Sequence, residues 1–128
     1  MTKNKTIWTI IFLLFLGLIV YYFYPEDKLP ADIQIDKLVV NKSERQMLAY
    51  SNGKLVKIYK ISLGGNPIGD KEFEGDKKTP EGNYIINDKN PNSGYHKNLG
   101  VSYPNEEDIE NAKRLGKPVG GDIKIHGL

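Results

Sequence analysis

The sequence has 128 residues, 18 basic and 16 acidic side chains, a formal net charge of +2 and no cysteine. A chain of this length has room for one folded domain, because single cores usually occupy about 100 to 150 residues. Without Lys3 and Lys5, the remaining 16 basic and 16 acidic residues balance. Such a balance provides no field that would gather phosphates, which argues against a nucleic-acid partner. The lack of cysteine excludes disulfides, thiolate zinc sites and a cysteine nucleophile within these residues.

An apolar segment near the start of the chain is long enough to cross a membrane. Residues 7–24 carry no charge, and these ~18 residues reach about 27 Å as a helix, close to the thickness of a bilayer core. Lys3 and Lys5 precede the segment, and aromatic residues lie at both ends, as in anchors whose basic side stays in the cytoplasm. The exit sequence Tyr-Tyr-Phe-Tyr-Pro lacks the small residues of a cleavage site, which favours an uncleaved anchor over a signal peptide. Since every face is apolar, a buried helix of a soluble domain fits less well.

The sequence therefore divides into three parts. We expect residues 1–24 to form a cytoplasmic tail and transmembrane anchor, residues 25–35 to form a tether, and residues 36–128 to form one mainly β domain. The prolines and charges of the tether resist both helix and membrane. The expected strands are short apolar runs bounded by Gly, Pro or Asn, and they lie at 37–42, 46–51, 54–62, 83–87, 99–103 and 122–126.

Two elements have strong local signals. Asn52 and Gly53, between two of the expected strands, predict a tight hairpin because both residues tolerate positive φ. A helix is expected over residues 106–115, since Asn105 can cap it, acidic residues follow at its positive end and Lys113 lies near its negative end. One short helix is thus expected within a β domain.

The last expected strand carries a candidate for chemistry. The sequence Asp-Ile-Lys-Ile-His at 122–126 alternates, so the two isoleucines share one face and His126 lies on the other face with the polar residues. Gly127 and two preceding glycines let a ligand approach an imidazole, the group that most often transfers protons near neutral pH. A lone strand histidine beside glycines is also typical of a structural or merely exposed residue. The pattern alone leaves both interpretations open.

Two polar segments are further candidates. Residues 75–82 combine turn formers with side chains, such as that of Thr79, that donate and accept hydrogen bonds; the alternative is a surface turn that leads into the next strand. Tyr95 and His96 follow Asn-Pro-Asn in an expected polar loop. His96 is a candidate cleft-lining residue, with an ordinary surface position as the alternative.

Several of these pieces, taken in order, carry a resemblance. The strand Lys-Leu-Val-Val-Asn-Lys and the hairpin are followed by Ile-Ser-Leu-Gly-Gly-Asn-Pro-Ile-Gly at 61–69, Glu-Gly-Asp-Lys-Lys-Thr-Pro-Glu-Gly-Asn-Tyr at 74–84, Asn-Pro-Asn-Ser-Gly-Tyr-His at 90–96, Val-Ser-Tyr-Pro-Asn at 101–105 and Gly-Gly-Asp-Ile-Lys-Ile-His-Gly at 120–127. Together they resemble the YkuD-type L,D-transpeptidase domain over roughly residues 36–128. No single segment decides this, and the joint order and spacing carry it.

The resemblance implies a β-sandwich-like fold and acyl transfer on peptidoglycan. In that family a cysteine thiolate attacks the carbonyl of a wall stem peptide, and an acceptor amine or water resolves the acyl-enzyme. The histidine of Ile-His-Gly pairs with the cysteine, a role that falls on His126. The resemblance further implies that Thr79, Tyr95, His96 and Gly127 contact the substrate. A nearby imidazole raises the thiolate fraction of a thiol, which gives the pairing a physical basis.

In one respect the sequence departs from the family. The family's cysteine lies in a Ser/Thr-x-Gly-Cys segment shortly after the histidine, and these 128 residues contain no cysteine. We therefore expect an incomplete L,D-transpeptidase-like sandwich that is inactive by itself. If the strand that ends at His126 normally pairs with later strands, its exposed edge makes the fold marginal.

Three functions remain open at this point. The chain is a piece of an L,D-transpeptidase of cell-wall biogenesis and cell shape, a non-catalytic membrane-anchored module that holds peptidoglycan, or a small adhesin or envelope scaffold; the last leaves the motif series unexplained. In each case we expect a single-pass protein of the bacterial cytoplasmic membrane, anchored through residues 7–24, whose C-terminal domain faces the periplasm or the cell exterior. No cofactor, metal or nucleic acid is expected. The acceptor substrate and the oligomeric state are open.

Overall fold

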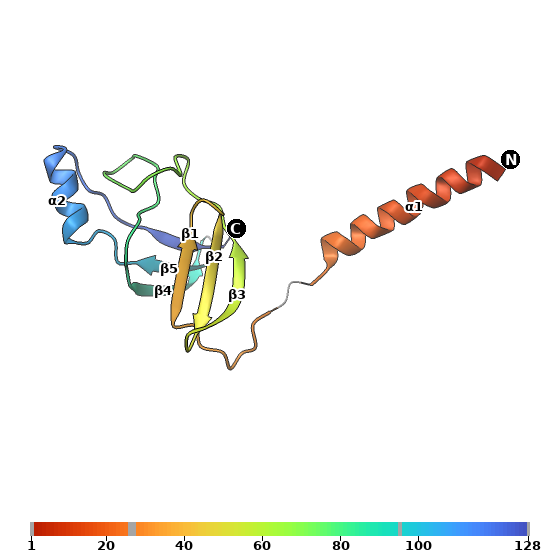
Figure 1. The fold of residues 1–128 in the computed structure, drawn as a ribbon, viewed down its shortest axis with the longest axis horizontal. Coiled ribbons are helices and arrows are strands. Elements are labelled where there is room, and N and C mark those ends of the chain that lie inside the picture. Colours follow the sequence, from red (N-terminus) through yellow and green to blue (C-terminus); the bar gives the residue numbers. More distant parts are fainter. Residues whose placement is uncertain (1, 26–27, 95, 128) are drawn as a thin grey trace. The chain divides into compact units, whose positions relative to one another are not determined.

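The computed structural model describes residues 2–25, 28–94 and 96–127 (Figure 1). The chain forms two compact units, Met1–Gln34 and Ile35–Leu128. The first unit contains helix α1, and the second contains helix α2 and the strands β1 to β6. The second unit is therefore mainly β, as the strand signals predict, and contains two small antiparallel sheets.

Helix α1 (Thr2–Phe23) makes up most of the first unit. Its stretch Asn4–Phe23 is 20 residues long with a mean hydropathy of 2.2, which is long and apolar enough to cross a membrane. Large apolar side chains are exposed along it, for example those of Trp8 at 70% and Leu14 at 68%. Because water disfavours exposed apolar surface, α1 is a candidate for a membrane span by its length and composition.

The first sheet is the meander of β1 (Lys37–Asn41), β2 (Gln46–Ser51) and β3 (Lys54–Lys60), in the order β1-β2-β3. The predicted hairpin joins β2 to β3. Asn52 and Gly53 have φ values of 48° and 75°, the positive values that a two-residue turn between twisted strands requires. Strands β1 and β3 end slightly earlier than predicted.

The second sheet consists of β4 (Ile86–Ser93), β5 (His96–Val101) and β6 (Lys124–His126), in the order β4-β5-β6. Both pairings are antiparallel. In Figure 1, β4 and β5 run across the direction of β1 to β3. The two sheets share no strand, so each forms its own backbone hydrogen-bond ladder.

The strands of the second sheet differ from the predicted strands at three places. The expected strand at 83–87 is replaced by β4, which starts later and runs through Pro91; this is possible because β4 is an edge strand, where a missing N–H costs no ladder hydrogen bond. His96 begins β5 and so does not lie in a loop. Strand β6 starts after Asp122, whose φ of 57° is left-handed and does not fit a strand.

Helix α2 (Glu106–Arg114) is confirmed, with Asn105 as its N-cap. The Asn105 side chain accepts a hydrogen bond from the backbone N–H of Asp108, and the Asp108 carboxylate accepts one from the backbone N–H of Asn105, which completes a capping box. Asp108 also accepts a hydrogen bond from the Tyr84 hydroxyl at 3.0 Å. Burial and this carboxylate raise the pKa of Tyr84 well above its usual range. The cap thus attaches α2 to the segment before β4.

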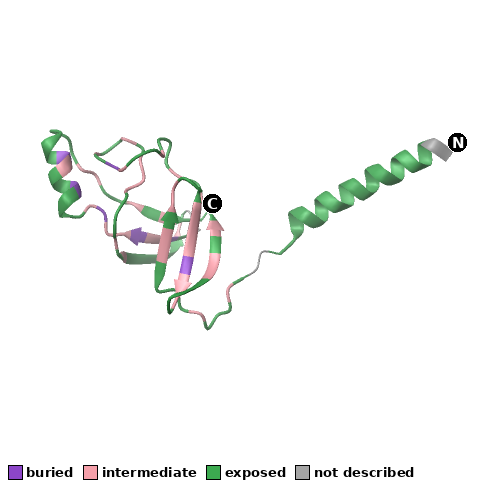
Figure 2. Ribbon diagram, viewed as in Figure 1, coloured by how far each residue is buried: buried purple, intermediate pink, exposed green. Residues whose placement is uncertain are grey.

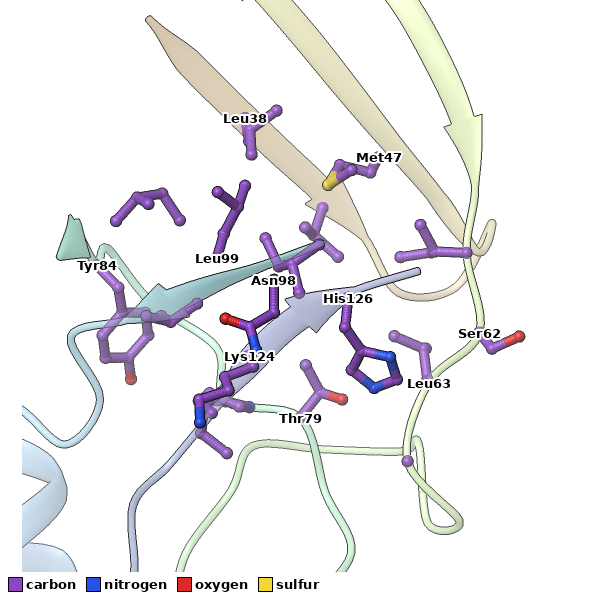
Figure 3. A pocket seen from close by; sticks show the side chains of 18 of the residues that line it. Leu38, Met47, Ser62, Leu63, Thr79, Tyr84, Asn98, Leu99, Lys124 and His126 are labelled. Atoms are coloured by element: carbon purple, nitrogen blue, oxygen red, sulfur yellow. The ribbon is translucent and has the colours of Figure 1, made fainter. Parts of the chain in front are cut away.

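Each sheet has an apolar face, and both faces line one large open hollow. The register of the first sheet places Leu38, Met47 and Tyr59 on one face. In the second sheet, Leu99 and Ile125 are directly paired and lie on one face. Figure 3 shows Leu99 projecting from β5 toward Leu38 and Met47. The alternation of both sheets therefore directs their apolar side chains into the same space.

The second unit nevertheless buries few apolar residues. Among the described residues, the buried apolar side chains are those of Ala49, Tyr103 and Ala112, at 0%, 5% and 1% exposure. Most residues of the two sheets are half-buried or exposed, as Figure 2 shows. Tyr103 packs near Tyr84, with ring centroids 6.0 Å apart, and its hydroxyl donates to the Val119 carbonyl. The best-packed region is therefore near α2.

Candidate functional site

Strand β6 presents its polar side chains away from the apolar face. Lys124 and His126 are exposed, whereas Ile123 and Ile125 are half-buried, as the alternation predicts. Asp122 departs from the pattern because it lies before the strand. Its carboxylate is 2.7 Å from the Lys124 ammonium, and this hydrogen bond raises the pKa of Lys124. The polar side of β6 thus carries an imidazole next to a lysine whose charge is already paired.

The His126 ring is oriented by its own backbone. Its Nδ1 lies 2.9 Å from the carbonyl oxygen of Gly127. A carbonyl oxygen only accepts hydrogen bonds, so Nδ1 must carry the proton in this contact. In the neutral ring, Nε2 is then the nitrogen with a lone pair. That nitrogen is the one that can take a proton from a neighbouring acid.

The cross-strand neighbour of His126 is Asn98 on β5. The two residues are directly paired, and the flanking backbone hydrogen bonds run from Gly127 N to Lys97 O and from Val101 N to Ile123 O. Asn98 and His126 therefore form a non-hydrogen-bonded pair, the type in which facing side chains lie closest. Asn98 is only 7% exposed. Its Oδ1 is buried and has no hydrogen-bond partner among the described residues.

The segment that contains Thr79 is fixed by Lys42, which directly follows β1. The Lys42 ammonium donates to the carbonyl oxygens of Gly69 and Thr79 at 2.6 and 2.9 Å, and to the Glu81 carboxylate at 2.8 Å. The Lys42 side chain is 13% exposed, so water competes little for these bonds. One cation therefore sets the distance between the first sheet and the Thr79 segment.

The preceding loop is organised around Asp76. Its carboxylate accepts hydrogen bonds from the Lys71 ammonium and from the backbone N–H groups of Glu72, Phe73 and Lys78. Burial alone would raise the pKa of Asp76, but these donors hold it well below its usual range. The loop is therefore a hydrogen-bonded structure that leads directly to Thr79.

The chain after β3 approaches the same loop closely. A Cβ atom on Gly64 would lie 2.3 Å from the Lys77 carbonyl oxygen, which explains the glycine at this position. Asn66 N donates to the same carbonyl oxygen at 3.1 Å. This contact holds the segment with Ser62 and Leu63 beside the Thr79 segment.

These elements meet at one part of the hollow. Figure 3 shows the His126 ring between Thr79 and Leu63, with Asn98 and Lys124 projecting on the same side of the sheet as His126. We call this region the polar part of the hollow. Its lining residues are Ser62, Leu63, Thr79, Asn98, Lys124, His126 and Gly127. The structure thus places Thr79 near His126 and Gly127, which lie much later in the sequence.

Residues 35–128 match the family model of the YkuD L,D-transpeptidase catalytic domain. The chain belongs to this family. No curated protein and no solved structure matches it. The family resemblance carried by the ordered motifs is therefore confirmed over the whole second unit.

Two expected substrate contacts of this L,D-transpeptidase domain are not located by the structure. Tyr95 lies outside the described residues. The backbone of His96 begins β5, and its side chain is also outside the described part. Across residues 2–25, 28–94 and 96–127, no group of three or more His, Asp or Glu side chains is placed to hold a metal ion. The described polar groups of the site are thus a histidine, an amide, two hydroxyls and a paired lysine.

The local sequence pattern does not indicate that Lys42, Asp76 or Asn98 belong to the candidate site. Lys42 and Asp76 act through carbonyl oxygens and N–H groups of distant backbone, which leave no signal in the local pattern. Asn98 alternates with the half-buried Leu99, which places it on the polar face of β5. Its pairing with His126 depends on the register between distant strands, which the sequence does not reveal.

Proposed function

We propose that this domain binds peptidoglycan stem peptides in the polar part of the hollow, and that His126 is the base that serves a cysteine thiolate in L,D-transpeptidation. One observation carries the proposal: His126 is exposed, with Nδ1 bound to the Gly127 carbonyl, and faces a hollow that Thr79 also lines. The membership of residues 35–128 in the YkuD family supports the choice of substrate.

The proposed chemistry follows from the tautomer. Nε2 of His126 takes the proton of a thiol, and the thiolate attacks the carbonyl carbon of a stem-peptide bond. The tetrahedral adduct collapses to a thioester, and the imidazolium returns the proton to the leaving amine. An acceptor amine or water then attacks the thioester and releases the thiol. Thr79, Tyr95, His96 and Gly127 are the proposed substrate contacts.

The 128 residues contain no cysteine. What they supply to this reaction is the binding surface and the imidazole. The second candidate function therefore keeps the first half of the proposal: a non-catalytic, membrane-anchored module that holds peptidoglycan. It is favoured by the same hollow, which needs no thiol in order to bind a peptide.

We also propose the placement of the protein in the cell. Residues 1–24 form a cytoplasmic tail and single-pass anchor in the bacterial cytoplasmic membrane, residues 25–35 a tether, and residues 36–128 an L,D-transpeptidase-like domain that faces the periplasm or the cell exterior. The apolar length of α1 supports the anchor. The apolar faces of the two sheets, which line one hollow, support a β-sandwich-like arrangement.

The test of binding uses the full chain in detergent micelles and purified peptidoglycan sacculi. We expect the chain to sediment with the sacculi and to be displaced by soluble stem peptides released from them. His126→Ala should weaken retention at least threefold, because it removes a group that lines the site. Lys54→Ala is the matched control, since Lys54 is exposed in the hairpin and outside the hollow. If the wild-type chain stays in the supernatant, both candidate functions are wrong.

The test of catalysis supplies the missing thiol. A peptide with a C-terminal thioester, mixed with an acceptor amine and a small thiol, reports whether His126 accelerates acyl exchange. We expect a modest rate increase that His126→Gln abolishes. Equal rates for the two proteins would leave the binding module as the function.

A further inference from the structure

The side-chain amide of Asn98 is buried, but its oxygen has no hydrogen-bond partner among the described residues. The whole residue is 7% exposed. Burying a polar atom without a partner is unfavourable, and nearly all such atoms in folded proteins have one. The position of Asn98 beside His126 therefore calls for a partner from outside the chain.

The polar neighbours of Asn98 are engaged elsewhere. On the β4 side its paired residue is Asn90, whose Oδ1 accepts from the backbone N–H of Asn92 at 2.9 Å. On the β6 side, the His126 ring bonds the Gly127 carbonyl through Nδ1. Lys124, the next residue on that face, is paired with Asp122 at 2.7 Å. None of these contacts satisfies Asn98 Oδ1.

Asn98 is also placed where a ligand would lie. It lines the same hollow as His126 and Thr79, and Figure 3 shows its side chain on the Thr79 side of β5. The terminal torsion of an asparagine side chain has a broad profile, so a small rotation turns Oδ1 toward the hollow. The non-hydrogen-bonded pairing with His126 keeps the amide close to the imidazole.

We infer that Asn98 recognises the peptide ligand. Its Oδ1 accepts a hydrogen bond from a backbone amide N–H of the stem peptide, at a position beside His126. The inference rests on the proposed function, because it assumes that a stem peptide occupies the polar part of the hollow. Asn98 acts as a binding and positioning residue that sets the peptide bond against the imidazole. It forms no covalent bond and transfers no proton.

The chemistry that fits this amide is that of a peptide. An acceptor oxygen next to a base selects a ligand that presents an N–H group close to the carbonyl that reacts, and a peptide backbone offers both within one residue. A site built to hydrogen-bond such a group discriminates strongly against ligands that lack it, because the buried acceptor is then left unsatisfied.

The first experiment compares affinity and stability in the full chain. Asn98→Leu has nearly the same shape as asparagine and removes the acceptor, while Asn98→Asp keeps an acceptor oxygen. Calorimetry with a synthetic stem tetrapeptide should show Asn98→Leu about tenfold weaker than the wild type. Asn98→Asp should stay within about threefold of the wild type, since a carboxylate accepts the same hydrogen bond. Thermal unfolding of Asn98→Leu should occur at the same or a higher temperature, because an unsatisfied buried polar group has been removed.

A second experiment identifies the hydrogen bond from the ligand side. Stem peptides with each backbone amide N-methylated in turn remove one N–H at a time. We expect one of these peptides to lose about tenfold in affinity for the wild type and to lose nothing further for Asn98→Leu. A structural role for Asn98 would not produce this coupling.

Three outcomes overturn the inference. An unchanged affinity of Asn98→Leu means that a buried water satisfies Oδ1 and that the ligand does not contact it. A lower unfolding temperature of Asn98→Leu, with a loss of affinity that is equal for all methylated peptides, means a structural role. If Asn98→Asp binds as weakly as Asn98→Leu, the amide does not act as an acceptor. His126→Ala distinguishes a failure of this inference from a failure of the proposed function. If His126→Ala weakens binding and Asn98→Leu does not, the stem peptide binds at this site and Asn98 does not contact it.

Discussion

The ammonium of Lys71 and the carboxylate of Asp76 lie 2.7 Å apart, and their side chains are only 7% and 3% exposed. This ion pair closes the loop that leads to Thr79, and the carboxylate also accepts three backbone hydrogen bonds. A buried pair with its remaining groups satisfied is costly to break, because removing one partner leaves the other charge uncompensated. The loop of the candidate site therefore depends on a single carboxylate.

We predict that Asp76→Asn lowers the free energy of unfolding by about 3 kcal/mol, since it leaves Lys71 buried without its counter-ion. The matched control is Glu72→Gln, which removes the ion-pair partner of Lys78. The Glu72 side chain is 50% exposed, so this pair lies at the surface. That change should cost less than about 0.5 kcal/mol. Urea unfolding followed by near-ultraviolet circular dichroism measures both. Equal effects of the two substitutions would contradict the buried role of Asp76.

The same carboxylate predicts how stability depends on pH. The hydrogen bonds from Lys71 and the backbone outweigh the effect of burial and hold the pKa of Asp76 far below its usual range, so the folded state keeps Asp76 ionised where the unfolded state binds a proton. The unfolded state then binds more protons, and stability falls as the pH falls. We expect the contribution to be complete above about pH 5 and to decrease progressively below it. In Asp76→Asn this part of the pH dependence should disappear. An unchanged slope of the unfolding free energy between about pH 5 and pH 3 would contradict this role of Asp76.

Lys42 gives a prediction that links the first sheet to the site. Lys42→Met keeps the apolar stem and removes the donor, which leaves the carbonyl oxygens of Gly69 and Thr79 without this partner. We expect a loss of about 2 kcal/mol in stability and faster hydrogen exchange of the amides in residues 78–82. Retention on sacculi should weaken because Thr79 loses its fixed position. Lys54→Met is the control, and identical exchange in both proteins would show that Lys42 does not hold the segment.

Local signals in the sequence were sufficient for the elements whose geometry is set by neighbouring residues. Asn52 and Gly53 determine the hairpin because they accept positive φ, and Asn105 determines the start of α2 because it caps the first turn. The alternation around His126 placed the imidazole on the polar side of β6. In each case the physical cause lies within a few residues of the chain.

The errors arose where strand pairing with distant segments or the local backbone conformation departs from the sequence pattern. Pro91 indicated a loop, but the edge position of β4 accommodates it. Asp122 continued the alternation in sequence but adopts a left-handed conformation and pairs with Lys124. The roles of Lys42 and Asn98 depend on which distant segments they face. Such contacts follow from the register of the sheets, which the local pattern does not contain.

The distribution of burial predicts where the stability of the second unit lies. Leu99 is half-buried and faces the hollow, whereas Tyr103 is 5% exposed and packs near Tyr84. We expect Leu99→Ala to cost only about 1 kcal/mol, below the range for fully buried leucines, and Tyr103→Leu to cost about 3 kcal/mol. Circular dichroism of the tyrosines during urea unfolding measures the difference. A larger effect at Leu99 would mean that the two sheets pack more tightly in solution than their exposure indicates.

The last prediction concerns the tautomer of His126, on which the proposed chemistry depends. The contact between Nδ1 and the Gly127 carbonyl requires the proton on Nδ1. We expect long-range proton–nitrogen correlation spectra of the neutral ring to show the Nδ1–H form, which is the minor tautomer of free histidine. His96→Gln removes the other histidine of the chain and makes the assignment unambiguous. A neutral ring protonated mainly on Nε2 would have no lone pair on that nitrogen to take the proton of a thiol, and the assignment of His126 as the partner of a thiol would fail.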